Sequence, residues 1–271
     1  MLISVVVTTY NQPDWLEKVL WSLGAQTDRN FEVLVADDGS GPATRELVSR
    51  ANTLAGVPVR HVWQEDRGFR KCAILNAAIR ASQGDYVVFL DGDCIPRQDF
   101  VAVHRRLARP GRFLSGGAFR LPRPVSVALS QDAILTGKAF RPGWLHAAGV
   151  PWSLRLARLG VHPAGAALLD ALTPTGATFN GGNASAWRED VLAVNGFEER
   201  LAYGGLDREF GERLENAGIR ARQVRHRALV VHLDHPRGYR DAAVMARNRA
   251  IRADTVATGR TRAVEGLDRY G

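Results

Sequence analysis

The chain has 271 residues, of which 45% are hydrophobic and 24% charged, and this balance excludes a disordered or low-complexity protein. Its 36 Lys and Arg against 28 Asp and Glu give a formal net charge of +8, which favours polyanionic partners such as phosphate-bearing substrates, nucleic acid or an acidic membrane surface. Two cysteines cannot form the disulfide framework of a secreted domain, and no stretch approaches the ~20 uncharged apolar residues of a spanning helix.

The first hundred residues alternate between strand and helix patterns. Residues 2–9 are a β-branched run typical of a parallel strand buried on both faces, and Pro13 suits the first position of the helix that follows. The same patterns predict further strands over residues 31–36, 57–63 and 86–90, and helices over residues 43–54 and 71–82. This alternation predicts an α/β fold with a Rossmann-like, mostly parallel central sheet flanked by helices.

The middle of the chain has a different character. Residues 118–176 contain two Trp, several Arg and many Ala, Leu and Pro, which predicts a helical insertion with a short amphipathic helix near residues 153–159. This insertion either covers the active face or meets anionic lipid head groups at a membrane surface. After it we expect a helix over residues 207–216, a strand over residues 228–233 and a basic helical tail over residues 241–271.

Polar clusters follow three of the predicted strands. They contain Thr8 and Tyr10, then Asp37 and Asp38, then the sequence Asp91-Gly92-Asp93. Ligands of such sheets bind beyond the carboxyl ends of the strands, so these clusters predict a site. Two carboxylates at this spacing can present oxygens to Mg²⁺ or Mn²⁺, and a cation held in this way usually also takes phosphate oxygens from the substrate.

The order and spacing of these motifs resemble the family 2 glycosyltransferases of the GT-A fold. Residues 5–11, 35–40 and 89–93 carry the resemblance, together with the intervening segment 66–78. In the second half of the chain, residues 179–188, 195–197 and 203–207 resemble galactosyltransferase and chondroitin-polymerase type enzymes. The resemblance covers residues 2–117 and 177–236.

The resemblance implies a role for each matching position. Asp37 or Asp38 would hold the uracil or ribose of the donor, and Asp91 would face the ribose or the metal. Asp93 and His232 would ligate Mn²⁺ or Mg²⁺, with His235 as the alternative to His232. The implied donor-binding residues are Thr8, Tyr10, Asp37, Asp38, Arg67, Lys71, Asn76 and Asp91; the acceptor-binding residues are Trp187, Tyr203, Gly204 and Gly205; and the catalytic base is Asp207.

The implied activity is an inverting, metal-dependent transfer of one sugar from a nucleotide-diphosphate sugar, with UDP as the expected nucleotide. The acceptor would be a glycan or a lipid-linked molecule of polysaccharide or lipopolysaccharide synthesis, and no specific nucleic acid is expected as a partner. The metal would stabilise charge on the leaving diphosphate, with help from Arg67, Arg70 or Lys71, while Asp207 takes the acceptor's proton.

We expect a single catalytic domain, with a nucleotide-sugar-binding half over residues 1–117 and an acceptor-binding half over residues 177–240. The first seven residues lack the positive charge of a signal peptide. The expected location is therefore the cytoplasm, or peripheral contact with the inner face of the membrane.

Two positions depart from the pattern of the resembling families. Leu206 stands where the galactosyltransferases usually carry an acidic residue, and Cys94 ends the metal motif at a position that is often acidic.

Two other functions compete with the glycosyltransferase interpretation. A nucleotidyltransferase would carry a Gly-rich basic loop after the first strand, and residues 9–13 are not one. A basic nucleic-acid-binding module would make no use of the acidic strand ends.

Overall fold

The computed structural model describes residues 1–235 and 241–270, which fold around a mixed, mostly parallel sheet. The order of its seven strands is β3 (Val59–Trp63), β2 (Phe31–Asp37), β1 (Ile3–Thr9), β4 (Tyr86–Asp91), β8 (Asn183–Trp187), β6 (Arg112–Ser115) and β9 (Arg220–Gln223). Only β8 runs antiparallel to its neighbours, β4 and β6. The predicted α/β architecture is confirmed.

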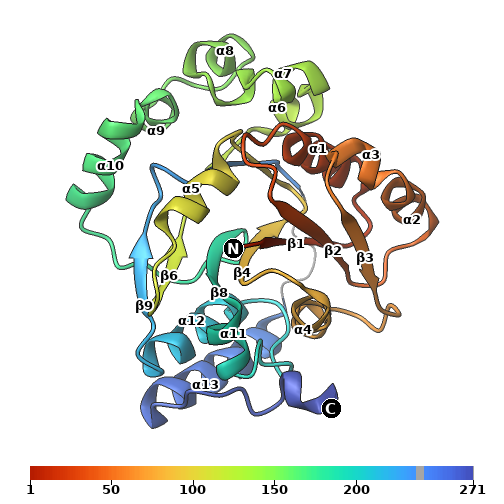
Figure 1. Ribbon diagram of the computed structural model, residues 1–271, viewed down its shortest axis with the longest axis vertical. Helices are drawn as coiled ribbons and strands as arrows, with labels where there is room; N and C mark the ends of the chain where they lie inside the picture. The colour runs from red at the N-terminus through yellow and green to blue at the C-terminus, as the bar shows by residue number, and fades with distance from the viewer. Residues whose placement is uncertain (236–240, 271) are drawn as a thin grey trace.

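Strand β1 lies at the centre of the molecule because its β-branched side chains pack on both faces of the sheet. Val5 and Val7 belong to a core with α1 (Pro13–Gly24), α2 (Pro42–Ser49) and α3 (Ala51–Ala55), whereas Val6 packs on the other face with α4 (Lys71–Ala81) and α12 (Leu206–Asn216). Successive strand residues point to opposite faces, so the consecutive valines Val5, Val6 and Val7 serve both cores. Figure 1 shows the two helical layers on either side of the sheet.

Two predicted boundaries differ from the structure. The helix expected over residues 43–54 is two helices, α2 and α3, which meet at Arg50. The third strand begins at Val59 because Pro58 has no N–H to donate, although its carbonyl accepts a hydrogen bond from the Val33 N–H. Pro13 is the first residue of α1, as predicted.

A second sheet, of three strands, begins directly after the end of β4. Its order is β5 (Cys94–Pro96), β10 (Leu229–His232) and β7 (Gly117–Arg120), and β10 runs antiparallel to β5. The helix α5 (Phe100–Leu107) follows β5. The register places His232 directly opposite Cys94, which brings a late part of the chain to the acidic end of β4.

The insertion is helical and forms an arc around the outer rim of the molecule (Figure 1). Its helices are α6 (Arg123–Ala128), α7 (Gln131–Leu135), η1 (Lys138–Phe140), α8 (Pro142–Ala147), α9 (Leu154–Ala157), η2 (Arg158–Gly160) and α10 (Pro163–Leu172). The helix expected near residues 153–159 is α9 followed by the 3-10 turn η2.

The remaining helices pack below the sheet in Figure 1; they are α11 (Arg188–Ala193), α12, α13 (Ala242–Thr258) and η3 (Leu267–Tyr270). The long helix of the tail, α13, ends at Thr258, because Gly259 takes a left-handed conformation with φ of 63°, and the short 3-10 helix η3 follows near the end of the chain. Residues 236–240 and 271 of the expected acceptor half and tail lie outside the described residues. Among the described helices, none is both long and apolar enough to cross a membrane.

Candidate active site

A cavity of about 520 Å³ opens beyond the carboxyl ends of β1 and β4, a size typical of small-molecule sites. Eleven of the predicted site residues line it: Thr8, Tyr10, Asp38, Lys71, Asp91, Asp93, Tyr203, Gly204, Gly205, Asp207 and His232. They come from both halves of the chain, so the fold brings residues as far apart as Thr8 and His232 into one wall.

Lys71 and Asp91 form an ion pair in the wall of the cavity. The register of β1 and β4 places Thr8 beside Asp91, and the Thr8 hydroxyl donates to Asp91 Oδ1 over 3.0 Å. Lys71, the first residue of α4, donates to the same oxygen from Nζ over 2.6 Å. Burial alone would lower the pKa of Lys71, but the carboxylates of Asp91, Asp207 and Asp93 outweigh it and raise that pKa, so the amine stays charged.

Asp207 lies in the first turn of α12 and faces the same cavity. Gly204 and Gly205 precede that helix with φ of 100° and 89°, a left-handed backbone that favours glycine and lets the chain turn sharply into the helix. Asp207 Oδ1 is buried against Gly181 and accepts no well-formed hydrogen bond from any residue that the structure describes. Burial raises the pKa of Asp207 and the charge of Asp91 raises it further, while Lys71 opposes the shift. A carboxylate of this kind can accept a proton.

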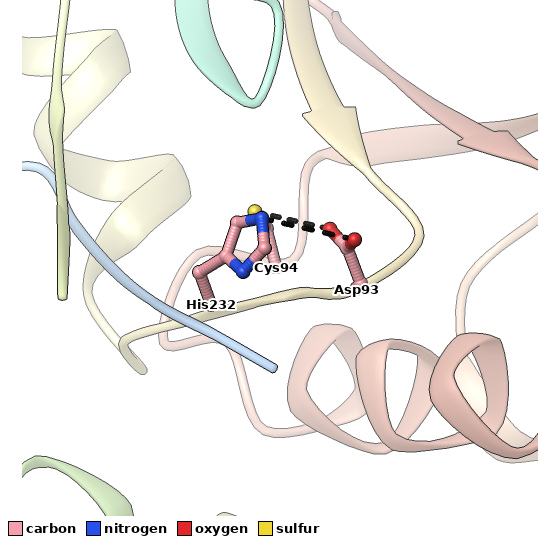
Figure 2. A group of neighbouring side chains, drawn as sticks. All are labelled: Asp93, Cys94 and His232. Carbon is pink, nitrogen blue, oxygen red and sulfur yellow. Dashed lines mark hydrogen bonds and ion pairs between the residues drawn. The ribbon is translucent and has the colours of Figure 1, made fainter. Parts of the chain in front are cut away.

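Asp93, Cys94 and His232 form a cluster of metal-ligating side chains, and their donor atoms all lie within 4.8 Å of one another. Figure 2 shows the three side chains close together: Asp93 comes from the turn between β4 and β5, Cys94 is the first residue of β5, and His232 is the last of β10. His232 Nε2 is 3.8 Å from Asp93 Oδ2, and His235 Nε2 is 2.9 Å from that same oxygen. Both histidines therefore face Asp93.

The donor set of this cluster fits a divalent cation. Burial works to raise the pKa of Asp93, but the interactions with His235 and His232 outweigh it and hold the pKa below its ordinary value, so the carboxylate is ionised. A carboxylate with an imidazole suits Mn²⁺ better than Mg²⁺, which prefers oxygen ligands alone. Asp93 and His232 are thus the residues that could hold the ion.

Asp38, not Asp37, contributes the carboxylate of the second strand end to the cavity. Asp38 accepts hydrogen bonds from Gln64 Nε2 over 2.5 Å and from the Arg70 backbone N–H over 2.9 Å, and burial raises its pKa. Asp37 points into the protein and is fully buried. It accepts a hydrogen bond from the Ser40 N–H and contacts His61, which indicates a role in shaping the turn.

Asn76 also lies outside the cavity wall, contrary to the expectation that it binds the donor. It is fully buried on α4, where its amide donates to the carbonyl of Phe197 and accepts from the N–H of the same residue, over 2.9 and 2.8 Å. These paired bonds join α4 to the segment after α11. The structure therefore gives Asn76 a scaffolding contact.

Arg67 and Trp187 are likewise placed away from the cavity. The Arg67 side chain is 70% exposed and pairs with Glu65. Trp187 ends β8 opposite Tyr86, at the amino end of β4, and packs edge-to-face against that ring. The cavity lies at the other end of β4, so the expectation that Trp187 contacts the acceptor is corrected by the antiparallel direction of β8.

Phe69, Asn180 and Arg120 are among the cavity residues that were not predicted as site residues. Phe69 packs edge-to-face on Tyr203, with ring centroids 5.7 Å apart, and Asn180 and Arg120 line the same cavity. Arg120 ends β7, a four-residue strand that the sequence pattern does not reveal, and its register partner is His232. Phe69 and Asn180 both stand within segments that carry the family resemblance, and that position was the available signal.

Two family models match the chain. The model described as glycosyl transferase family 2 matches residues 4–113, and the model described as N-terminal domain of galactosyltransferase matches residues 172–236. Validoxylamine A glucosyltransferase of Streptomyces hygroscopicus subsp. jinggangensis is 30% identical over 80% of the chain and 52% of its own length. Chondroitin synthase of Escherichia coli is 28% identical over 86% of the chain and 35% of its own length. The chain thus spans about half or less of these curated relatives.

Solved structures show the same fold. TarS 1–349 of S. aureus in complex with UDP-GlcNAc superposes with a TM-score of 0.63 at 17% identity, covering 99% of this chain and 69% of its own. The mannosyltransferase PcManGT of Pyrobaculum calidifontis, in complex with GDP-Man and Mn²⁺, superposes with a TM-score of 0.58 at 24% identity, covering 88% of this chain and 58% of its own. The solved structures show that the chain has the GT-A fold, and the two matching family models show that it belongs to the family 2 glycosyltransferases.

Proposed function

We propose that the protein transfers one sugar from a nucleotide-diphosphate sugar, with UDP as the preferred nucleotide, to a hydroxyl group of a glycan or lipid-linked acceptor. The supporting observation is the convergence of Asp93, Asp207 and Lys71 on one cavity. This arrangement provides a cation site for a diphosphate and a carboxylate for proton transfer within one small volume. Four carboxylates around the cavity also make it a poor site for a nucleic-acid backbone.

The donor is proposed to lie along the ends of β1 and β2. Asp38 can accept a hydrogen bond from a base N–H or a ribose hydroxyl, and the Tyr10 ring stands exposed at the rim of the same wall. Its hydroxyl donates to Asp66 over 2.9 Å, which orients the ring. The sugar would then reach toward Asp91 and Asp207.

Departure of the diphosphate requires positive charge near the phosphate oxygens. Asp93 and His232 would hold Mn²⁺ or Mg²⁺, which, when bound, supplies Lewis-acid stabilisation of the leaving group. Lys71 keeps its charge and lines the same cavity, held by its ion pair with Asp91, so it would add preorganised electrostatic stabilisation. Arg120 lies on the same wall and contributes a second positive charge.

Asp207 is proposed to be the general base. As the acceptor oxygen bonds to the anomeric carbon, the bond from that carbon to the phosphate oxygen breaks, and its electron pair leaves with the diphosphate. The hydroxyl proton moves to Asp207, whose raised pKa makes it a better proton acceptor than an exposed carboxylate. Attack from the face opposite the diphosphate inverts the anomeric centre.

The insertion is proposed to contact the inner face of a membrane, as a lipid-linked acceptor would require. Trp152 is 60% exposed and Leu154 is 79% exposed, and Arg155 and Arg158 follow in the same short segment. Exposed apolar side chains beside cations suit the boundary between lipid head groups and acyl chains.

Donor hydrolysis tests the proposed reaction without knowledge of the acceptor. UDP-glucose, UDP-galactose, their N-acetylamino forms and GDP-mannose are each incubated with the protein and Mn²⁺, and release of the nucleoside diphosphate is measured. We expect one UDP-sugar to be preferred, and early NMR spectra to show free sugar with the anomeric configuration opposite to that of the donor. Retained configuration would contradict inversion. Absence of release from every donor, or equal release by Asp207→Asn, would contradict the proposal as a whole.

A further inference from the structure

Cys94 brings a thiol into the proposed cation site. It opens β5 opposite His232, lines the cavity and is 1% exposed. Its Sγ lies 3.5 Å from Asp93 Oδ1. A Cβ at Gly182 would lie 3.5 Å from that sulfur and 2.8 Å from Asp91 Oδ2, so glycine keeps the space in front of the thiol open.

The three side chains offer three different donor types to one point. Sulfur, imidazole nitrogen and carboxylate oxygen are the ligands of zinc sites, which can keep a fourth position open. Metal-ligand bonds of 2.0 to 2.3 Å place the donors of a tetrahedral site roughly 3.3 to 3.6 Å apart. Cys94 Sγ lies 3.5 Å from Asp93 Oδ1 and His232 Nε2 lies 3.8 Å from Asp93 Oδ2, close to that spacing, and one donor atom of each residue lies within 4.8 Å of the others. Small side-chain adjustments would complete the site.

We propose that Cys94 turns the cation site into a mixed carboxylate, thiolate and imidazole centre that binds thiophilic divalent cations such as Zn²⁺ or Cd²⁺ through sulfur, in competition with Mn²⁺. The inference rests on the cation site of the proposed function. On binding, the S–H bond breaks, a metal–sulfur bond forms and the proton passes to solvent, with no change of oxidation state. Three protein ligands leave the ion fewer positions for diphosphate oxygens, so these cations inhibit donor binding.

The experiment is a Cd²⁺ titration of the metal-free protein, followed by the ultraviolet charge-transfer band of a cadmium–sulfur bond. The wild-type protein should develop this band and Cys94→Ser should not, with an affinity for Cd²⁺ lower by about tenfold or more. Cys72→Ser is the matched control, because Cys72 is the other cysteine of the chain and is equally buried, but lies on α4 outside the cavity wall. It should keep the band.

Mn²⁺ binding, measured by electron paramagnetic resonance, separates failure of this inference from failure of the proposed function. Cys94→Ser should bind Mn²⁺ about as well as the wild type, which also shows that the site has folded. Normal Mn²⁺ binding without a cadmium–sulfur band in the wild type overturns the inference and leaves the proposed function standing. A band that survives in Cys94→Ser overturns it as well. Failure of the wild type to bind either ion overturns both the inference and the proposed cation site.

Discussion

At the scale of single residues, Asp207 is the side chain whose chemistry is most sensitive to its surroundings. Replacing it with asparagine keeps its size and removes its capacity to take a proton. We expect Asp207→Asn to lower kcat for sugar transfer or donor hydrolysis by roughly 10²- to 10⁴-fold, the usual contribution of a general base. Calorimetry should show little change in donor binding. A variant that retains at least a third of wild-type turnover would exclude Asp207 as the base.

The raised pKa of Asp207 sets the pH dependence. A general base must be ionised, so activity is present above its pKa and is lost as the pH falls through it. Because the pKa is raised, the acid limb of kcat/KM against pH should lie above the ordinary aspartate value of about 3.9. Lys71→Met removes the cation that opposes the shift, so its acid limb should move to higher pH, whereas Lys71→Arg should leave it nearly unchanged. If the acid limb of Lys71→Met lay at the same pH as that of the wild type, the coupling between the charge of Lys71 and the pKa of Asp207 would be contradicted.

Family motifs identified Asp91, Asp93 and Asp207 from the sequence, but they could not distinguish Asp37 from Asp38. Adjacent residues at the end of a strand point in opposite directions, and only the turn geometry decides which one reaches the cavity. Here Asp37 is held inward by Ser40 and His61. A buried structural aspartate and a binding aspartate are identical in the sequence.

At the scale of elements, the segment before β8 packs against two carboxylates of the site. Gly181 lies against Asp207, and Gly182 lies against Asp91. A Cβ at Gly181 would lie only 2.5 Å from Asp207 Oδ1, so Gly181→Ala must displace that side chain. We expect turnover to fall by up to roughly 100-fold, because displacements near 1 Å have this effect on catalysis. Gly176→Ala is the control in the same segment, since nothing lies within 4 Å of its Cβ. If both variants turn over equally, the packing of Gly181 on Asp207 is irrelevant to the reaction.

The exposed apolar residues of the insertion lead to a prediction about binding to membranes. Replacing Trp152 and Leu154 together with glutamate should abolish sedimentation of the protein with vesicles of anionic lipid, because both apolar contact and charge attraction are lost. Leu192→Glu is the control, since this partly exposed leucine lies on α11, far from α9 (Figure 1). Equal sedimentation of the double variant and the wild type would rule out this contact surface.

Strands β1 and β4 could be predicted from the sequence because each is an almost continuous apolar run, and α4 because its apolar residues recur at helical spacing. Strand β10 lies within the strand predicted over residues 228–233, whereas the short strands β5 and β7 were not predicted. Both are defined by pairing with β10 across more than 100 residues of sequence. This pairing delivers His232 and Arg120 to the cavity, so a proposed metal ligand and an arginine of the site depend on long-range contacts.

At the scale of the whole molecule, a buried ion pair joins the helices below the sheet. Arg213 and Glu209 pair over 2.8 Å with side chains 0% and 1% exposed, and Thr255 of α13 donates to Glu209 over 3.0 Å. Arg213→Leu leaves the Glu209 charge buried and should lower the free energy of unfolding by about 3–5 kcal/mol. Urea unfolding measures this change. Arg260→Ala breaks a more exposed pair with Asp254 and should cost at most about 1 kcal/mol. If both variants lowered the free energy of unfolding by a similar amount, the difference expected between the buried and the exposed ion pair would be wrong.

The central claim is that a divalent cation held at Asp93 binds the diphosphate, and thermal unfolding with UDP tests it most directly. A ligand that binds only the folded state raises the melting temperature. We predict that UDP stabilises the wild-type protein in the presence of Mn²⁺ and not without it, that Asp93→Ala loses this effect, and that Asp234→Ala, at a neighbouring exposed carboxylate, keeps it. Equal stabilisation by UDP in the absence of divalent cations, or in Asp93→Ala, would contradict the account.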